Sequence, residues 1–199
     1  MLSRSVNLII VLALLGFSAC SSDETTHVGN TDSPGGDFTL SAVSGPVSLH
    51  DYQGKVVLLF FGYTYCPDIC PAILDHVASA FDLLSEAELE KVQGVFVTVD
   101  PERDSPQHLA EYVGFFHPRF IGLSGTEKQI SEAARAYQVE YHRVDSDSVE
   151  KYAMIHTIYL FIIGPDGKVV DMMSHKTRPE DIAQVVRQWL SKDMAKDVK

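Results

Sequence analysis

The sequence predicts an α/β fold in which helices cover both faces of a central sheet. Two continuous apolar runs, at residues 55–61 and 94–99, are typical of strands that are buried on both faces. A segment with helical spacing of apolar residues follows each run. The chain then continues with a hairpin signal and closes with an amphipathic segment, and this alternation of strands and helices is typical of α/β proteins.

The first half of the chain contains a predicted hairpin, two buried strands and two helices. Residues 38–49 predict a short hairpin before the first buried strand. The second buried strand leads to a helix at residues 106–116, with Ser105 as its expected N-cap and Pro106 as its first residue. The helix between the two strands is predicted from apolar residues at helical spacing, namely Ile73, Val77, Ala80, Phe81 and Leu84.

The second half repeats this alternation and then ends in a hairpin and a helix. A Glu- and Lys-bearing first turn marks a helix at residues 126–137, and Gly-Pro-Asp-Gly at residues 164–167 is a turn signal. The other predicted elements are strands at 120–123, 158–163 and 168–173 and a closing helix at 179–190.

Size and composition indicate one globular domain with short appendages. A chain of 199 residues is long enough to bury a sizeable core. Its 45% hydrophobic and 22% charged content is typical of a folded rather than a disordered protein. The formal net charge of −11 argues against nucleic acid as a partner, because phosphate contacts need clustered Lys and Arg.

The first 19 residues have the pattern of an export signal. Arg4 provides a positive start, residues 8–15 form an unbroken apolar run, and two small residues precede Cys20. The end of this segment resembles a bacterial lipobox, in which the cysteine becomes the lipidated first residue, although Phe17 departs from the usual aliphatic residue. The alternatives are an ordinary signal peptide in which Cys20 is incidental, or an uncleaved anchor.

All three interpretations predict an exported protein held at a membrane, on the periplasmic or another extracytoplasmic side. Residues 20–36 are rich in Ser, Thr, Asp and Gly, and this composition predicts a flexible tether. Residues 37–199 are then expected to form the folded domain.

The other two cysteines lie between the first buried strand and the following helix, in the motif GYTYCPDICP at residues 62–71. Each precedes a proline, which disfavours helical backbone at the residue before it. We therefore expect Cys66 and Cys70 on a loop, with Cys70 capping the helix and Pro71 as its first residue. The field at a helix N-terminus stabilises the thiolate, which is the form that attacks disulfides and binds metals.

The spacing of the two cysteines leaves several chemistries open. The pair can form a redox-active disulfide, or it can hold one metal ion with two sulfurs. A purely structural disulfide is common in exported proteins, but closing so small a loop removes little chain entropy. Structural zinc is disfavoured, because zinc usually takes four Cys or His ligands at paired spacings and the sequence has no second pair.

The cysteine motif resembles that of the Sco/SenC family, which are thioredoxin-like copper proteins linked to assembly of the copper centre of cytochrome c oxidase. Every fixed position of the family pattern Gly-[Phe/Tyr]-Thr-x-Cys-Pro-Asp-x-Cys-Pro is present. A second stretch, VTVDPERDSP at residues 97–106, resembles another family block, and the likeness runs from about residue 38 to residue 191. The resemblance implies a thioredoxin-like fold, with a central mixed sheet flanked by helices, and copper as Cu(I) or Cu(II).

The resemblance also implies that His156 is the third copper ligand beside Cys66 and Cys70. In thioredoxin-like folds the loop at this position faces the cysteines and normally carries a cis-proline, which this sequence lacks. Family members usually have Asp before this histidine and Ser after it, where this chain has Ile and Thr. A ligand histidine needs an acceptor for its other ring nitrogen, and Asp100 is the candidate for that role.

Two functions follow from these residues. Two thiolates suit Cu(I) and an added imidazole accommodates Cu(II), so the first hypothesis is a metallochaperone that delivers copper to a copper-accepting subunit of cytochrome c oxidase, or to its assembly factors. The alternative is a membrane-tethered thiol–disulfide oxidoreductase, in which Cys66 and Cys70 form the redox pair and reduce a partner's cysteines. A thiol peroxidase is a third, weaker hypothesis. His156 discriminates between the metallochaperone and the oxidoreductase, because disulfide exchange needs no metal-binding imidazole. Tyr63 and Tyr65 are expected to shield the metal.

Overall fold

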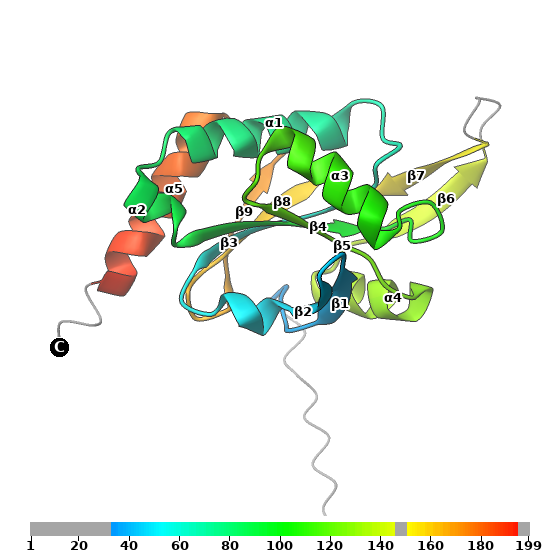
Figure 1. Cartoon of the computed structure of the whole chain (residues 1–199), viewed down its shortest axis with the longest axis horizontal. Helices are drawn as coiled ribbons and strands as arrows, with labels where there is room; N and C mark the ends of the chain where they lie inside the picture. Colours follow the sequence, from blue (N-terminus) through cyan, green and yellow to red (C-terminus); the bar gives the residue numbers. More distant parts are fainter. Residues whose placement is uncertain (1–32, 146–150, 195–199) are drawn as a thin grey trace, which may run out of the picture. The chain divides into compact units, whose positions relative to one another are not determined.

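The computed structural model describes residues 33–145 and 151–194 of the chain (Figure 1). The predicted export signal at residues 1–19 and the predicted lipidation site Cys20 lie outside these ranges. Within them, no helix combines the length and the apolar character that crossing a bilayer requires.

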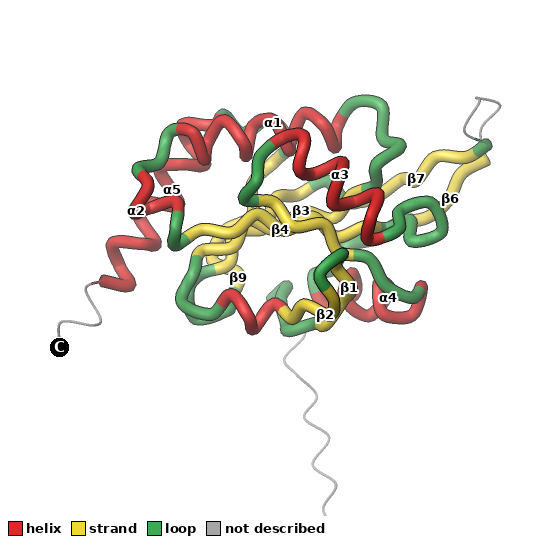
Figure 2. The backbone as a smooth tube through the Cα atoms, in the orientation of Figure 1, coloured by secondary structure: helices red, strands yellow, loops and turns green. Residues whose placement is uncertain are grey.

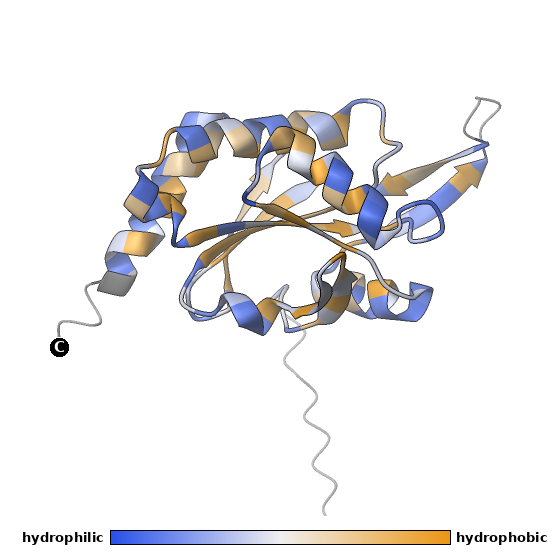
Figure 3. Cartoon of the chain, in the orientation of Figure 1, coloured by the Kyte–Doolittle hydropathy of each residue, from blue (hydrophilic) through white to orange (hydrophobic). Residues whose placement is uncertain are grey.

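A five-stranded mixed sheet forms the centre of the domain, with the strand order β5-β4-β3-β8-β9. The pairs β3–β4 and β4–β5 are parallel, and the pairs β3–β8 and β8–β9 are antiparallel. The central strand β3 is buried along its whole length, as its continuous apolar sequence predicts, and much of the sheet is coloured as hydrophobic in Figure 3. The strands are β3 (Val56–Gly62), β4 (Val92–Thr98), β5 (Phe120–Leu123), β8 (Tyr159–Ile163) and β9 (Val169–Ser174).

Helices cover both faces of this sheet, as predicted. Helices α1, α3 and α5 lie on one face, and α4 lies on the other face together with the β1–β2 hairpin (Figures 1 and 2). Crossover connections between parallel strands bring α1 and α3 to the same side. The elements are α1 (Ile69–Asp82), α3 (Pro106–Phe116), α4 (Glu127–Ala136), α5 (Pro179–Met194), β1 (Thr39–Ala42) and β2 (Gly45–Ser48), with a 3-10 turn η1 (Leu49–Tyr52) and a short helix α2 (Glu86–Leu89).

The start of α1 differs from the prediction. The helix begins at Ile69 with Asp68 at the N-cap, so Cys70 and Pro71 both lie in its first turn rather than at its boundary. Proline is tolerated there because the first N–H groups of a helix have no partner within the helix. The preference against helical backbone before proline was overruled at Cys70, whereas Cys66 lies on the loop as expected.

A second hairpin, which the apolar pattern did not predict, carries His156. Strands β6 (Tyr141–Asp145) and β7 (Tyr152–His156) pair antiparallel and form a separate two-stranded sheet. Strand β6 reads YHRVD and is mostly exposed, so it lacks the alternation by which a half-buried strand is recognised.

The folded domain begins slightly earlier than predicted. Gly35 donates its N–H to the carbonyl of Ala136 at 2.8 Å, and the hydroxyl of Tyr137 donates to the carbonyl of Gly36 at 3.0 Å. The last residues of the segment predicted as a tether, 20–36, therefore pack against the end of α4.

Candidate functional site

The two cysteines lie together where β3 passes into α1. Cys66 is half-buried on the loop, Cys70 is fully buried in the first turn of the helix, and both are free thiols. The N–H of Cys70 donates to the sulfur of Cys66 at 3.4 Å. Gly62, the last residue of β3, leaves room for this arrangement, because a Cβ there would lie 2.9 Å from Cys70 Sγ. The loop and the helix start thus hold the two sulfurs as neighbours.

His156, at the end of β7, joins the cysteines. Its Nε2 lies 3.6 Å from Cys70 Sγ, and its ring meets those of Tyr63 and Phe60 edge-on. Its Nδ1 lies 2.8 Å from the carbonyl oxygen of Thr157. Since a carbonyl can only accept, Nδ1 carries the proton and Nε2 presents its lone pair toward the sulfurs. This is the tautomer that a metal-binding histidine requires.

The spacing of these donors suits one metal ion. A sulfur and a nitrogen bound to the same ion at about 2.3 Å and 2.0 Å lie roughly 3.5–3.7 Å apart for bond angles of about 110–120°. Within residues 33–145 and 151–194, no three His, Cys, Asp or Glu side chains are already gathered as a metal-binding group. Cys66 and His156 each contact Cys70, but the three side chains do not already form a metal-binding group.

The two thiols differ strongly in acidity. The pKa of Cys66 is lowered far below that of an ordinary thiol, mainly by a hydrogen bond from the Cys70 thiol and further by the N–H groups of Cys70 and Asp68. The pKa of Cys70 is raised, because it donates that hydrogen bond and is buried. The pair therefore shares one proton, with Cys66 as thiolate and Cys70 as thiol.

This asymmetry gives a pH prediction for a soluble form lacking residues 1–20, which retains only Cys66 and Cys70. We expect alkylation of Cys66 by iodoacetamide to stay fast well below pH 8, because the reactive thiolate persists as the pH falls. Free cysteine loses its thiolate near pH 8.5. Cys70→Ser should shift the midpoint upward, since it removes the principal hydrogen-bond donor. A wild-type midpoint near 8.5 would contradict the shared proton.

Tyrosines 63 and 65 have different positions at the site. Tyr63 is buried and its ring centroid lies 5.8 Å from that of His156, so it forms a wall of the cluster. Tyr65 is 40% exposed and lies beside His108 instead, with ring centroids 6.1 Å apart. Of the two, Tyr63 is the one placed to shield His156.

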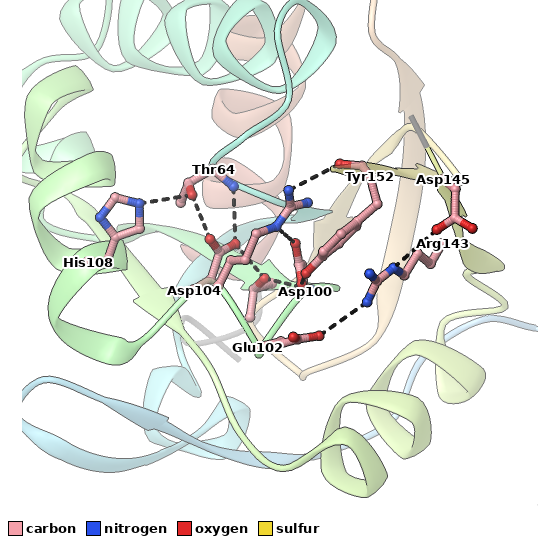
Figure 4. A network of polar contacts seen from close by, with 10 residues as sticks. Thr64, Asp100, Glu102, Asp104, His108, Arg143, Asp145 and Tyr152 are labelled. Carbon is pink, nitrogen blue, oxygen red and sulfur yellow. Dashed lines mark hydrogen bonds and ion pairs between the residues drawn. The ribbon is translucent and has the colours of Figure 1, made fainter. Parts of the chain in front are cut away.

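A buried carboxylate, which the sequence did not indicate, holds the cysteine loop. Asp104 is fully buried and accepts hydrogen bonds from the N–H of Thr64 at 3.1 Å and from the hydroxyl of Thr98 at 2.6 Å. It also accepts from the hydroxyl of Thr64 at 2.5 Å, and that hydroxyl lies 3.0 Å from Nε2 of His108 (Figure 4). Burial raises the pKa of Asp104. These contacts fix the backbone two residues before Cys66.

Asp100 does not take the place predicted for it. The acceptor for His156 is the carbonyl of its neighbour Thr157, whereas Asp100 accepts from the Tyr152 hydroxyl at 2.9 Å and from Nε of Arg103 at 2.5 Å. Because the carbonyl of Thr157 accepts from Nδ1, His156 needs no carboxylate neighbour to fix its tautomer.

Comparison with known proteins agrees with this geometry. A family model described as SCO1/SenC matches residues 27–191, which is most of the chain and includes all three clustered residues. The chain belongs to the SCO1/SenC family. The mitochondrial SCO2 homologue of Bos taurus is 40% identical over 158 residues, which cover 78% of this SCO1/SenC chain and 59% of the cattle protein. The chain thus spans about six tenths of that relative's length.

Two solved Sco structures resemble this SCO1/SenC chain. Arabidopsis thaliana ScoI, crystallised with copper bound, has 34% identity and a TM-score of 0.73, covering 79% of this chain and 98% of the other. BsSco, in which a disulfide switch was identified, is a member of the Sco family of cytochrome c oxidase assembly proteins. It has 28% identity and a TM-score of 0.61, covering 80% of this chain and 94% of the other. The predicted fold is confirmed.

Proposed function

We propose that this protein is a copper-binding metallochaperone that delivers copper to cytochrome c oxidase for assembly of its binuclear copper centre. The observation that carries the proposal is the meeting of a thiolate, a second thiol and an imidazole with a free Nε2 in one cluster. Copper bound to a solved relative supports it. The proposed ligands are Cys66, Cys70 and His156.

Each side chain would contribute differently to binding. Cys66 already offers a thiolate, Cys70 has to give up its proton, and His156 offers a neutral nitrogen. Two soft sulfurs suit Cu(I), and the imidazole adds a ligand that Cu(II) accepts. Three protein ligands leave a position open for a group of the receiving partner, which is what transfer between proteins requires.

Copper loading tests this proposal. The reduced soluble form lacking residues 1–20, titrated with Cu(I) and separately with Cu(II), should bind about one ion per chain. The Cu(II) complex should show the intense near-ultraviolet and visible absorption of sulfur-to-copper charge transfer. Cys20 is absent from this form, so any sulfur signal comes from the pair. The proposal would be wrong if the protein bound no more copper than buffer without protein retains.

The position of the protein in the cell is part of the proposal. We propose that residues 1–19 are a lipoprotein-type export signal, that Cys20 is lipidated, and that the segment from Cys20 onward tethers the domain to the extracytoplasmic side of a membrane. The copper-accepting subunit of the oxidase, or one of its assembly factors, would then be met at the same membrane. Mass spectrometry of the detergent-extracted protein tests this, because Cys20→Ala should abolish a diacylglyceryl mass increment.

A thiol–disulfide oxidoreductase is the second candidate, and the acidity difference between the thiols favours it. The Cys66 thiolate would attack one sulfur of a partner's disulfide and release the other sulfur as a thiolate. Cys70 would then lose its proton and attack Cys66, which releases the partner's second sulfur. The partner gains two electrons from the pair, one proton from Cys70 and a second proton from water, and the pair ends as a disulfide. The disulfide switch in BsSco supports this candidate.

A further inference from the structure

Arg103 lies between the loop that carries the cysteines and the hairpin that carries His156. Its guanidinium carbon is 3.6 Å from the centroid of the Tyr152 ring, 4.7 Å from that of Tyr65 and 5.8 Å from that of Tyr63. Tyr152 begins β7, whereas Tyr63 and Tyr65 lie on the loop just before Cys66. One side chain therefore contacts both segments that supply the proposed ligands.

On the hairpin side, Arg103 belongs to a closed and largely buried triangle. Its Nε donates to Asp100, its Nη1 donates to the carbonyl of Tyr152 at 3.1 Å, and the Tyr152 hydroxyl donates to Asp100 at 2.9 Å. Asp100 is 3% exposed and Tyr152 is 6% exposed. Figure 4 shows Tyr152 directed at Asp100. Charge-assisted hydrogen bonds of this kind fix the geometry of their partners, and removing one partner leaves the other buried and unpaired.

The hairpin needs such an attachment because of its place in the fold. Strands β6 and β7 form their own two-stranded sheet and are not hydrogen-bonded into the five-stranded sheet. Two-stranded hairpins are marginally stable by themselves. The end of β7 is held where Tyr63 meets His156, and its beginning is held by the triangle.

We propose that Arg103 is a positioning residue, which fixes the β6–β7 hairpin against the cysteine loop and thereby sets where His156 lies relative to Cys66 and Cys70. Its consequence for copper rests on the proposed function, whereas the positioning itself follows from the contacts. Lysine should not replace arginine in this role. A planar guanidinium can stack on the Tyr152 ring while its N–H groups donate to the Asp100 carboxylate and to the Tyr152 carbonyl, and a compact ammonium group cannot do all three.

Arg143 provides a matched control on the same tyrosine. Its guanidinium carbon lies 3.6 Å from the centroid of the Tyr152 ring, as that of Arg103 does. The side chain of Arg143 is 49% exposed, and its acidic partners Glu102 and Asp145 are exposed as well (Figure 4). Exposed pairs contribute little because water and salt screen them. Losing Arg143 removes a similar stacking contact without breaking the buried triangle.

The first test uses the reduced, metal-free soluble protein and nuclear magnetic resonance. In Arg103→Gln, we expect the ring-to-ring contact of Tyr63 and His156 to disappear and amide hydrogen exchange in β7 to accelerate by about 10-fold or more, while β3 stays protected. Arg143→Gln should leave both readouts unchanged, and Arg103→Lys should recover less than half of the protection. An intact ring contact in Arg103→Gln would overturn the proposal, as would an equal loss of protection in β3 and β7.

A milder variant keeps the test informative if Arg103→Gln does not fold. Tyr152→Phe retains the stacked ring and removes only the hydroxyl that donates to Asp100. We expect a smaller acceleration of β7 exchange, of about 3-fold, with β3 again unchanged. Wild-type exchange in β7 of Tyr152→Phe would contradict the triangle's role.

The second test measures copper. Arg103→Gln should weaken Cu(II) binding by about 10-fold or more, in the range seen for residues that orient metal ligands, and should change Cu(I) binding much less, because both sulfurs remain on one segment. Unchanged Cu(II) binding would overturn the proposed consequence. If the wild-type protein itself binds no copper, the proposed function fails, and the metal-free measurements still decide whether Arg103 positions the hairpin.

Discussion

Replacing His156 by alanine should weaken Cu(II) binding by roughly 100-fold or more, because the change removes a direct ligand and even residues that only orient ligands are worth about 10- to 100-fold. Cu(I) binding should fall much less, since two thiolates satisfy that softer ion. The measurement is a competitive titration of each oxidation state against a chelator of known affinity, monitored by absorption.

His142→Ala is the matched control for this variant. His142 is exposed on β6 and pairs with Ile155, next to His156 on the same hairpin. The His142→Ala protein should bind Cu(I) and Cu(II) as the wild type does. The His156→Ala protein should also keep most of its ability to reduce a disulfide substrate, because Cys66 and Cys70 are intact. Equal Cu(II) affinities for the two histidine variants would rule out His156 as a ligand.

Replacing Cys66 by serine should abolish both copper binding and disulfide reduction. The variant loses the thiolate that is ready for either reaction, and the remaining thiol of Cys70 is buried, which disfavours its charged form. A serine hydroxyl is a hard donor that Cu(I) avoids and that does not attack disulfides. Stoichiometric Cu(I) titration and a disulfide-reduction assay measure the two losses.

Cys70→Ser separates the roles of the two sulfurs. This variant should also lose stable Cu(I) binding, yet its Cys66 should still be alkylated. Cys66 should also form a mixed disulfide with a small-molecule disulfide. That mixed disulfide should persist, because the variant has no second thiol to displace the bound molecule. Retention of half or more of the copper by Cys66→Ser, with a wild-type melting curve, would show that the metal binds elsewhere.

Local sequence signals predicted most of the central sheet and its helices. Helix α3 has the predicted bounds with Ser105 as its cap, and strand β5 also lies where it was expected. In these segments the capping residues, the proline position and the apolar pattern all favour the same structure. At α1 two local rules disagreed, and the tolerance of a first turn for proline overruled the preference against helical backbone at Cys70.

The site was only partly predictable. The cysteine motif is contiguous and its resemblance to a family is specific, so Cys66 and Cys70 could be named from the sequence. His156 was named through that resemblance alone, since it lies 86 positions from Cys70 and on a hairpin that the apolar pattern does not reveal. The contacts of Asp104, Arg103 and Tyr152 join segments far apart in the chain, and no local pattern encodes them. Asp100 was the candidate acceptor for His156, and its actual partners, Arg103 and Tyr152, explain why it does not take that role.

The most direct test of the account is cytochrome c oxidase activity in cells that lack this protein, complemented with the full-length chain or its variants at matched expression. If copper delivery is the function, the wild type and His142→Ala should restore oxidase activity, whereas Cys66→Ser and His156→Ala should not. Full restoration by His156→Ala, with none by Cys66→Ser, would contradict copper delivery and would leave thiol reduction as the task of the protein.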